Sequence, residues 1–260
     1  MQIHEPTVLR PSISAVFPAY NDGGTIGSLV VTTLHTLSEL TDDYEVIVVE
    51  NGSTDYTLEV LEDLAATHPR LRVMPHRVAL GYGGALRTGF AAATKELIFY
   101  TDGDAQYDPR ELKLLVPYMQ PSIDIINGYK ISRSDPLHRI VIGRIYHHLM
   151  KLAFGFKLRD VDCDFRLIRR SVFEVVELEL LESPDGTFPL ELVKKLQDAG
   201  FHFAEVPVHH FHRTYGTSQF FNWRRLRRIP PQLLKLWWNL VVRRKHLGQM
   251  QARRTARRVS

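Results

Sequence analysis

The feature that most constrains this chain is an alternation of short apolar runs with longer segments of helical pattern. Runs rich in β-branched residues occur near residues 15, 47, 73, 99 and 126. Each is followed by turn-forming polar residues and then by a spacer long enough for a helix. Consecutive parallel strands need crossover connections of about a dozen residues or more, which such spacers provide. The pattern therefore predicts an α/β fold with a doubly wound, mainly parallel sheet flanked by helices.

The second half of the chain is less regular. Helical spacing extends over residues 137–154 and again over residues 190–200, where Gly200 is placed to end the helix. Two further runs, 165–170 and 203–211, have the composition of strands. We count these elements in the same domain as the first half.

The 260 residues are enough for one large domain with an appendage. We place the domain at residues 1–218 and a basic, amphipathic helical tail at residues 219–260. The division follows the charge: the formal net charge is +4, but residues 213–260 hold 13 Lys or Arg and no acid. The preceding 212 residues hold 20 bases against 29 acids, so the body is acidic and the tail strongly basic.

The tail contains the apolar segment IPPQLLKLWWNLVV, which includes Lys235 and Asn239 and has arginine clusters on both sides. A bilayer span needs roughly 20 apolar residues, so this segment is too short and too polar to cross. Its pattern favours a helix in the membrane interface, with Trp237 and Trp238 at the level of the headgroups. The alternative is a helix that packs its Leu and Trp side chains on the domain.

The arginine clusters also suit nucleic-acid binding, but the acidic body would repel a polyphosphate, so we expect no nucleic-acid partner. The single cysteine, Cys163, fits a reducing compartment, and the N-terminal residues lack the pattern of a signal peptide. We therefore expect a cytoplasmic protein that touches the inner face of the membrane peripherally through its tail.

The stretch TDGDAQYDP, residues 101–109, places acids at the end of an apolar run. Carboxylate and amide oxygens are the ligands that Mg²⁺ or Mn²⁺ takes while sharing its coordination with a diphosphate. Unpaired carboxylates at a buried strand end would be costly, so a cation is implied. Asp102, Asp104 and Gln106 are the candidate metal ligands. Asp108 precedes a proline and has the pattern of a helix N-cap instead.

The loops PAYND and ENGSTD follow the first two strands. In doubly wound sheets, ligands bind beyond the carboxyl ends of the strands, where both loops fall. Glu50 and Asp55 flank a turn and can accept hydrogen bonds from a ribose or a base. Each loop alone is an ordinary strand-to-helix connection, but together they indicate a nucleotide pocket. The Gly-rich LGYGGALRTG matches neither a P-loop nor a dinucleotide fingerprint, which argues against a kinase or a dehydrogenase.

Two further clusters admit more than one interpretation. The acids of RDVDCDFR, residues 159–166, include a candidate general base for a hydroxyl acceptor, and they also suit a polar turn before a strand. His209, His210 and His212 do not share one face of a strand, so a structural role is favoured over metal binding.

Six segments in order resemble a known family: PAYND, VVENGSTD, GYGGALRTG, DGDAQYDP, DVDCDFRLIRR and HRTYGTSQF. They are similar to the family 2 inverting nucleotide-sugar glycosyltransferases of GT-A fold, and within them to polyprenyl-phosphate sugar synthases such as the dolichyl-phosphate mannose synthases. The similarity covers roughly residues 12–222. The resemblance implies metal-dependent transfer of a sugar from a GDP- or UDP-sugar to a polyprenyl or dolichyl phosphate. The alternative acceptor is a hydroxyl compound, such as a saccharide or another cell-envelope precursor.

The resemblance also assigns roles to individual residues. Those implied in donor binding are Pro18, Tyr20, Asp22, Glu50, Asp55, Gly81, Arg87, Asp102 and Ser218. Those implied in catalysis are Asp104, Arg133, Asp160 and Arg213. Arg139 and Arg144 are expected near the acceptor phosphate, and Arg213 and Ser218 in a loop over the diphosphate. Two positions depart from the family pattern, because Asp22 stands where Glu is common and Gln219 where Lys is usual.

Overall fold

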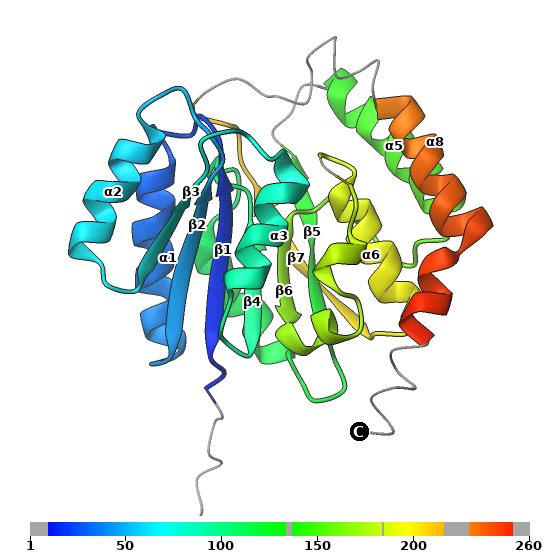
Figure 1. Cartoon of the computed structure of the whole chain (residues 1–260), viewed down its shortest axis with the longest axis horizontal. Coiled ribbons are helices and arrows are strands. Elements are labelled where there is room, and N and C mark those ends of the chain that lie inside the picture. Colours follow the sequence, from blue (N-terminus) through cyan, green and yellow to red (C-terminus); the bar gives the residue numbers. More distant parts are fainter. Residues whose placement is uncertain (1–9, 134–136, 184, 216–228, 252–260) are drawn as a thin grey trace, which may run out of the picture.

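The computed structural model describes residues 10–133, 137–183, 185–215 and 229–251. Over these residues the chain forms a seven-stranded sheet between two layers of helices (Figure 1). The strands are β1 (Ile13–Ala19), β2 (Tyr44–Glu50), β3 (Leu71–Pro75), β4 (Leu97–Thr101), β5 (Ile125–Arg133), β6 (Phe165–Arg169) and β7 (Phe203–His210). Their order across the sheet is β3-β2-β1-β4-β6-β5-β7.

The sheet is mainly parallel, as the alternating sequence pattern predicts, and β6 is the exception. Strands β1 to β4 pair in parallel, and so do β5 and β7. Strand β6 runs antiparallel to both β4 and β5, and its first residue, Phe165, lies opposite the last residue of β4, Thr101. The start of β6 therefore lies at the edge of the sheet where the other strands end.

The helices are α1 (Ile26–Leu40), α2 (Thr57–Thr67), α3 (Tyr82–Ala92), α4 (Leu112–Leu115), α5 (Leu137–Phe154), α6 (Phe188–Asp198) and α8 (Ile229–Trp237). Short 3₁₀ turns are η1 (Pro109–Glu111), η2 (Val116–Tyr118), η3 (Arg170–Glu174) and η4 (Leu178–Leu180), and η5 (Trp238–Arg243) is wound as a π-helix. The pattern over residues 109–119 predicts one helix, but the structure has η1, α4 and η2 in succession. Pro117 lacks the amide hydrogen that a continuous helix needs there.

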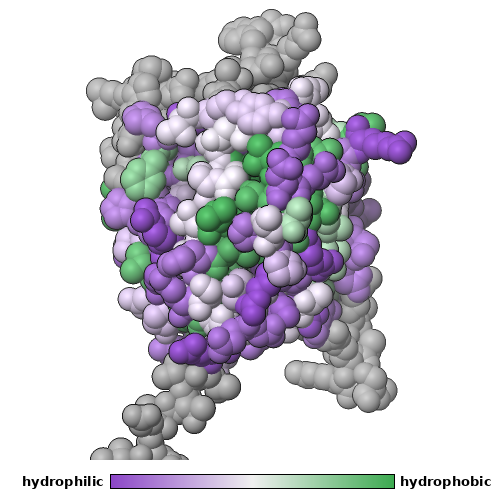
Figure 2. All heavy atoms as spheres, turned by 90° about the vertical axis from the view of Figure 1, so that its left-hand side faces the viewer, coloured by the Kyte–Doolittle hydropathy of each residue, from purple (hydrophilic) through white to green (hydrophobic). Residues whose placement is uncertain are grey.

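The core lies on both faces of the sheet because successive side chains of a buried strand point to opposite sides. On β1, Ala15 and Phe17 belong to the apolar cluster that includes residues of α1, α2 and α4, whereas Val16 belongs to the cluster that includes residues of α3 and α6. The alternation of apolar runs and helical spacers is thus realised as a layer of helices on each face (Figure 1). Figure 2 views the end of the molecule near α1, α2 and β3, where polar side chains surround smaller apolar areas.

The described part of the tail packs on the domain. Helix α8 lies beside α5 (Figure 1), and the Trp237 indole Nε1 donates to the carbonyl of Ala153 at 2.9 Å. Leu236 and Leu240 are buried in a third apolar cluster with residues of α5 and α6. The sequence leaves two alternatives for the tail, a membrane interface and packing on the domain. Packing on the domain therefore accounts for one face of the helix. Trp238, the second interface tryptophan expected from the sequence, remains exposed.

The expected boundary between residues 218 and 219 falls outside the described residues and stays a prediction. Among the helices that the structure describes, none has both the length and the apolar character to cross a bilayer.

Candidate active site

The loops after β1 and β2 are joined by hydrogen bonds into one surface. Asn21 adopts a left-handed conformation with φ of 57°, and its side-chain oxygen accepts the amide of Thr54 at 2.8 Å. Asp55 accepts the amide of Gly23 at 3.2 Å, and Glu50 accepts the amide of Ser53 at 2.5 Å. The predicted proximity of PAYND and ENGSTD is therefore confirmed. Glu50 and Asp55 also organise their own turns, and their contact with a nucleoside stays a prediction.

Asp22 lies at the inner end of this surface, nearly buried. Its Oδ2 accepts the amide of Tyr20 at 3.0 Å, and Gly103 of the DGD segment is close enough that an added Cβ would come within 3.2 Å of the same oxygen. Burial raises the pKa of Asp22 to about 6, with the negative charge of Asp104 adding to the effect. The β1 loop and the β4 loop thus bring their carboxylates together.

Asp102 and Asp104 follow β4 and point into the same acidic region. Burial raises the pKa of both carboxyl groups, and for Asp102 the charges of Asp164 and Asp104 raise it further. The Tyr82 hydroxyl, in the first turn of α3, donates to Asp102 Oδ1 at 2.7 Å. The hydroxyl oxygen of Thr101 is buried and has no hydrogen-bond partner among the described residues.

This donor set fits a divalent cation. The neighbouring groups are hard oxygens, and burial disfavours their charged forms unless a positive charge arrives. Asp108 is not part of the set, because its Oδ1 accepts the amide of Arg110 at 3.0 Å and caps η1, as the sequence predicts.

A positive side chain reaches the acids from the segment after β7. Arg213 Nη2 lies 2.5 Å from Asp104 Oδ2, and Nη1 lies 3.7 Å from Asp22 Oδ1. Arg213 thus lies beside the DGD acids, and its expected place over the diphosphate stays a prediction. The Gln106 side chain donates from Nε2 to the backbone carbonyl of Phe211 at 3.0 Å. The backbone carbonyl of Gln106 accepts the amide of Phe211 at 2.8 Å. In the structure Gln106 therefore anchors this segment, and its role as a metal ligand stays a prediction.

The loop of RDVDCDFR reaches the same edge because β6 begins there. The buried Arg166 donates from Nε to Asn127 Oδ1 at 2.6 Å and pairs through Nη1 with Asp164 at 3.0 Å. Lys130 of β5 donates from Nζ to the carbonyl of Asp162 at 2.8 Å. Burial raises the pKa of Asp162 to about 6. These contacts fix the loop against β5 and β6.

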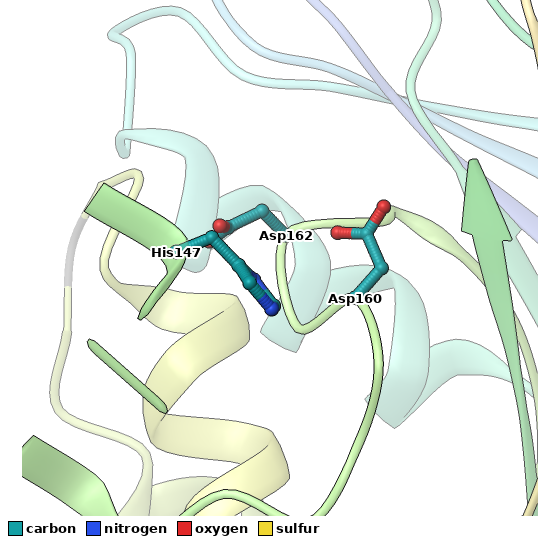
Figure 3. A group of neighbouring side chains, drawn as sticks. All are labelled: His147, Asp160 and Asp162. Carbon is teal, nitrogen blue, oxygen red and sulfur yellow. The ribbon is translucent and has the colours of Figure 1, made fainter. Parts of the chain in front are cut away.

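His147 projects from α5 toward this loop and forms a group with Asp160 and Asp162 (Figure 3). One ligand atom from each of the three residues lies within 4.8 Å of the others, which is compatible with a metal ion. However, Lys130 Nζ lies 3.8 Å from Asp160 Oδ2 and already supplies a positive charge. The same holds for Asp104, which has Arg213 as its cationic partner, so both groups are candidates and the metal role of Asp102 and Asp104 stays a prediction.

Several other predicted residues have structural contacts. Gly81 has a φ of 76° at the start of α3, where its carbonyl accepts from Asn51 Nδ2 at 3.3 Å. Arg87 Nη1 donates to the carbonyls of Leu181 and Ser183 at 2.7 and 3.0 Å. Pro18 is buried in β1, next to Gly103. The roles of these residues in donor binding stay predictions.

Ser218 lies outside the described residues. Arg133 ends β5, and Arg139 and Arg144 belong to α5, but their side chains are outside the description. Among the histidines, His209 bonds Glu111 through Nδ1 at 2.5 Å, and the ring of His210 lies 5.0 Å from that of Tyr107. Both fit the structural interpretation.

Three residues of the site were not singled out in the sequence. Tyr82 and Lys130 contact the acids, and Tyr215 lies with its ring 6.1 Å from that of Tyr56, over the loop after β1. An added Cβ at Gly24 would overlap the Tyr215 ring. Tyr82 and Tyr215 do stand inside recognised segments, GYGGALRTG and HRTYGTSQF, which was the one available signal.

The comparisons with known proteins agree with this geometry. The model of the family described as "Glycosyl transferase family 2" matches residues 14–176, more than half of the chain. Glycosyltransferase AglD of Haloferax volcanii is 33% identical over 253 residues, which are 92% of this chain and 40% of that protein. An undecaprenyl-phosphate 4-deoxy-4-formamido-L-arabinose transferase of Yersinia pestis is 29% identical over 222 residues, 85% of this chain and 65% of that protein. The chain thus spans less than two thirds of the length of these relatives.

Solved structures show the same fold. Glucosyl-3-phosphoglycerate synthase from Mycobacterium tuberculosis, in complex with Mn²⁺, UDP and glucosyl-3-phosphoglycerate, superposes with a TM-score of 0.61 at 20% identity. The match covers 92% of this chain and 86% of that one. A complex of the same enzyme with Mg²⁺ and UDP also gives a TM-score of 0.61. The matched residues include the loops after β1, β2 and β4 and the start of β6, and on this match the chain belongs to glycosyl transferase family 2.

Proposed function

We propose that this protein transfers a sugar from a nucleotide diphosphate to the phosphate of a polyprenyl lipid. The observation that carries the proposal is the meeting of Asp22 and Asp104 with Arg213 at the carboxyl ends of the strands. Cleavage of a sugar–diphosphate bond leaves charge on the nucleoside diphosphate, which a divalent cation and an arginine are suited to stabilise.

The donor half of the proposal rests on the joined loops and the DGD acids. Mg²⁺ or Mn²⁺, held by Asp102 and Asp104 with Gln106 as the third candidate, would neutralise the diphosphate of a UDP- or GDP-sugar. The surface formed by the loops after β1 and β2 lies beside these acids and would hold the nucleoside. Solved structures of the same fold contain Mn²⁺ or Mg²⁺ together with UDP, which supports this donor chemistry.

The acceptor half rests on α5. This helix contains Arg139, Arg144 and Lys151 and no acid, and it begins four residues after Arg133, the last residue of β5. A phosphate monoester is already anionic, so it needs cationic side chains to position it and no strong general base. The Yersinia pestis relative is named for transfer to undecaprenyl phosphate, which favours a lipid acceptor of this kind.

We propose further that α5 and the tail rest on the cytoplasmic face of a membrane. Both present apolar side chains to solvent at helical spacing, and these are Ile145, Leu149 and Leu152 on α5 and Leu234, Trp238 and Val242 on α8 and η5. Neither α5 nor residues 229–251 contain an acid. Exposed apolar and basic side chains together are the chemistry of peripheral binding to anionic lipid.

The test is transfer of a radiolabelled sugar from UDP- or GDP-sugars into the organic phase, with undecaprenyl phosphate as acceptor and Mn²⁺ present. We expect metal-dependent transfer, lost in Asp104→Ala and retained in Asp108→Asn, because Asp108 caps η1 and pairs with Arg110 outside the acidic region. The proposal would be contradicted if the rate of nucleoside diphosphate release did not change when lipid phosphate or metal was left out, or in Asp104→Ala.

A hydroxyl acceptor is the second candidate, and one observation favours it. The pKa of Asp162, raised to about 6, suits a general base near neutral pH better than an ordinary aspartate does. The family resemblance implies Asp160 in catalysis, whereas the raised pKa favours Asp162 as the base in this loop. Efficient transfer to a water-soluble saccharide without lipid would support this candidate.

A further inference from the structure

Arg213 pairs with a carboxylate that a metal ion at this site would need as a free ligand. Its Nη2 lies 2.5 Å from Asp104 Oδ2, and Nη1 lies 3.7 Å from Asp22 Oδ1. Both acids are nearly buried, so this guanidinium compensates charges that water cannot reach. In the structure, the cationic partner of Asp104 is therefore an arginine.

A divalent cation and this arginine compete for the same carboxylate. Asp104 Oδ1 accepts the amide of Gln106 at 3.0 Å, and Oδ2 is taken by Arg213. A cation shared by Asp102 and Asp104 would lie within a few ångströms of the guanidinium, where like charges at low dielectric repel strongly. One of the two contacts has to be given up.

We propose that Arg213 is a placeholder counter-ion that leaves Asp104 when the metal and the donor diphosphate bind. The inference rests on the proposed function, because it takes the DGD acids as the metal site. Arg213 Nε is buried and has no hydrogen-bond partner among the described residues. The guanidinium thus keeps an unused donor, which an anionic oxygen of the diphosphate would satisfy once the metal has taken Asp104.

The backbone on either side of Arg213 is held, so the exchange is a movement of the side chain. Phe211 exchanges two hydrogen bonds with Gln106, and the Tyr215 ring packs edge-on against Tyr56 and over Gly24. These contacts keep Arg213 at the boundary between Asp104 and the loops proposed to bind the nucleotide. Metal loading and diphosphate binding are thereby coupled through one residue.

The coupling predicts opposite effects of Arg213→Ala on two ligands. Mn²⁺ binding without nucleotide, followed by the electron paramagnetic resonance signal of free Mn²⁺ at pH 8, should tighten roughly tenfold, because the metal no longer displaces a charge-assisted hydrogen bond. Binding of UDP or GDP in saturating Mn²⁺ should weaken by about the same factor, because the arginine's contact with the diphosphate is lost. Arg213→Lys should lie between the two for both ligands.

Arg110→Ala is the matched control, because Arg110 is also an arginine bound to an aspartate of this loop, but through Asp108 on the outside. It should change neither affinity, and thermal melts should show that both variants are folded. Mn²⁺ binding that depends on Asp104 but is unchanged or weaker in Arg213→Ala would overturn the placeholder role and leave the proposed function standing. Absence of any Mn²⁺ binding that depends on Asp104 would overturn both.

Discussion

The hydroxyl of Tyr82 donates to Asp102 Oδ1 at 2.7 Å, and so joins the first turn of α3 to the end of β4. Burial raises the pKa of Tyr82 well above its usual range, so the phenol keeps its proton and remains a donor. The contact orients one carboxylate of the proposed metal site from a helix that contributes no ligand of its own. Residues that orient ligands in this way commonly matter almost as much as the ligands.

Tyr82→Phe should therefore weaken Mn²⁺ binding by roughly 10- to 100-fold, the range seen when such supporting hydrogen bonds are removed. The measurement is a Mn²⁺ titration together with kcat at saturating metal. Tyr118→Phe serves as the control, because that tyrosine is exposed on η2. Equal Mn²⁺ affinity in Tyr82→Phe and the unaltered protein would show that Asp102 needs no such support.

The buried acids predict an unusual dependence of stability on pH. Burial raises the pKa of Asp22 from 3.8 to about 6, so between these values the folded state binds more protons than the unfolded state. The free energy of unfolding of the ligand-free protein should then fall as the pH rises from 4 to 7, by at most about 3 kcal/mol from this residue. Asp102 and Asp104, whose pKa values are also raised, act in the same direction.

Urea denaturation at pH 4.5 and pH 7.5 checks this expectation. Asp22→Asn should be stabilised relative to the unaltered protein at pH 7.5 and much less so at pH 4.5. A variant that shows the same difference between the two pH values as the unaltered protein would assign the effect to other groups.

Arg166 should be among the residues most sensitive to substitution. It is fully buried and bonds Asn127, Asp164, the Tyr100 hydroxyl and the carbonyl of Val161. Arg166→Leu leaves Asp164, whose side chain is only 17% exposed, without its cation, which costs roughly 3–5 kcal/mol. Arg170→Leu, at an exposed arginine four residues along, should change the free energy of unfolding by no more than about 0.5 kcal/mol. Similar chemical denaturation curves for the two variants would contradict the assignment.

The two faces of the tail should separate stability from membrane binding. Leu240 is 3% exposed and packs against α5 and α6, so Leu240→Ala should cost about 2–5 kcal/mol of stability. Trp238 is 49% exposed, so Trp238→Ala should leave stability within about 0.5 kcal/mol. Flotation with anionic vesicles should show the reverse order, with Trp238→Ala more weakly bound. Unchanged flotation of Trp238→Ala would argue against the membrane contact.

Asp162 distinguishes the two acceptor classes. Removal of a general base lowers a rate by roughly 10²- to 10⁴-fold, whereas a phosphate acceptor needs no such base. Asp162→Asn should therefore lower the rate of transfer to undecaprenyl phosphate by much less than a hundredfold. Steady-state rates with lipid phosphate and with a saccharide acceptor, measured side by side, test this. A loss of a hundredfold or more with the lipid acceptor would show that Asp162 takes a proton in the reaction.

Much of the fold and half of the site follow from local sequence patterns. Alternating apolar runs predict the strands, and loops that follow parallel strands must meet at one edge, which brings Asp22, Asp55 and Asp104 together. The cap at Asp108 is local as well. These predictions succeed because each depends on neighbours in sequence or on the direction of the sheet.

The rest depends on pairings that local pattern does not encode. Arg213 is 109 residues from Asp104, and nothing in either segment specifies that the arginine takes the metal ligand as its partner. The antiparallel direction of β6 is set by its neighbours, since an apolar strand reads the same in both directions. The tail pattern favours a membrane interface but also suits a protein surface, and the packing of Leu236 against the domain decides for one face only.

The chain has two halves, one from β1 to α4 and one from β5 onward, which includes the antiparallel β6. The elements from β1 to β4 supply every carboxylate proposed for the donor, while β5, α5, the β6 entry loop and α8 supply the proposed acceptor side. Arg213, which follows β7, crosses this division, because its guanidinium pairs with Asp104. A chimaera with a relative that is joined between α4 and β5 would therefore keep the proposed donor carboxylates but take their arginine partner from the relative.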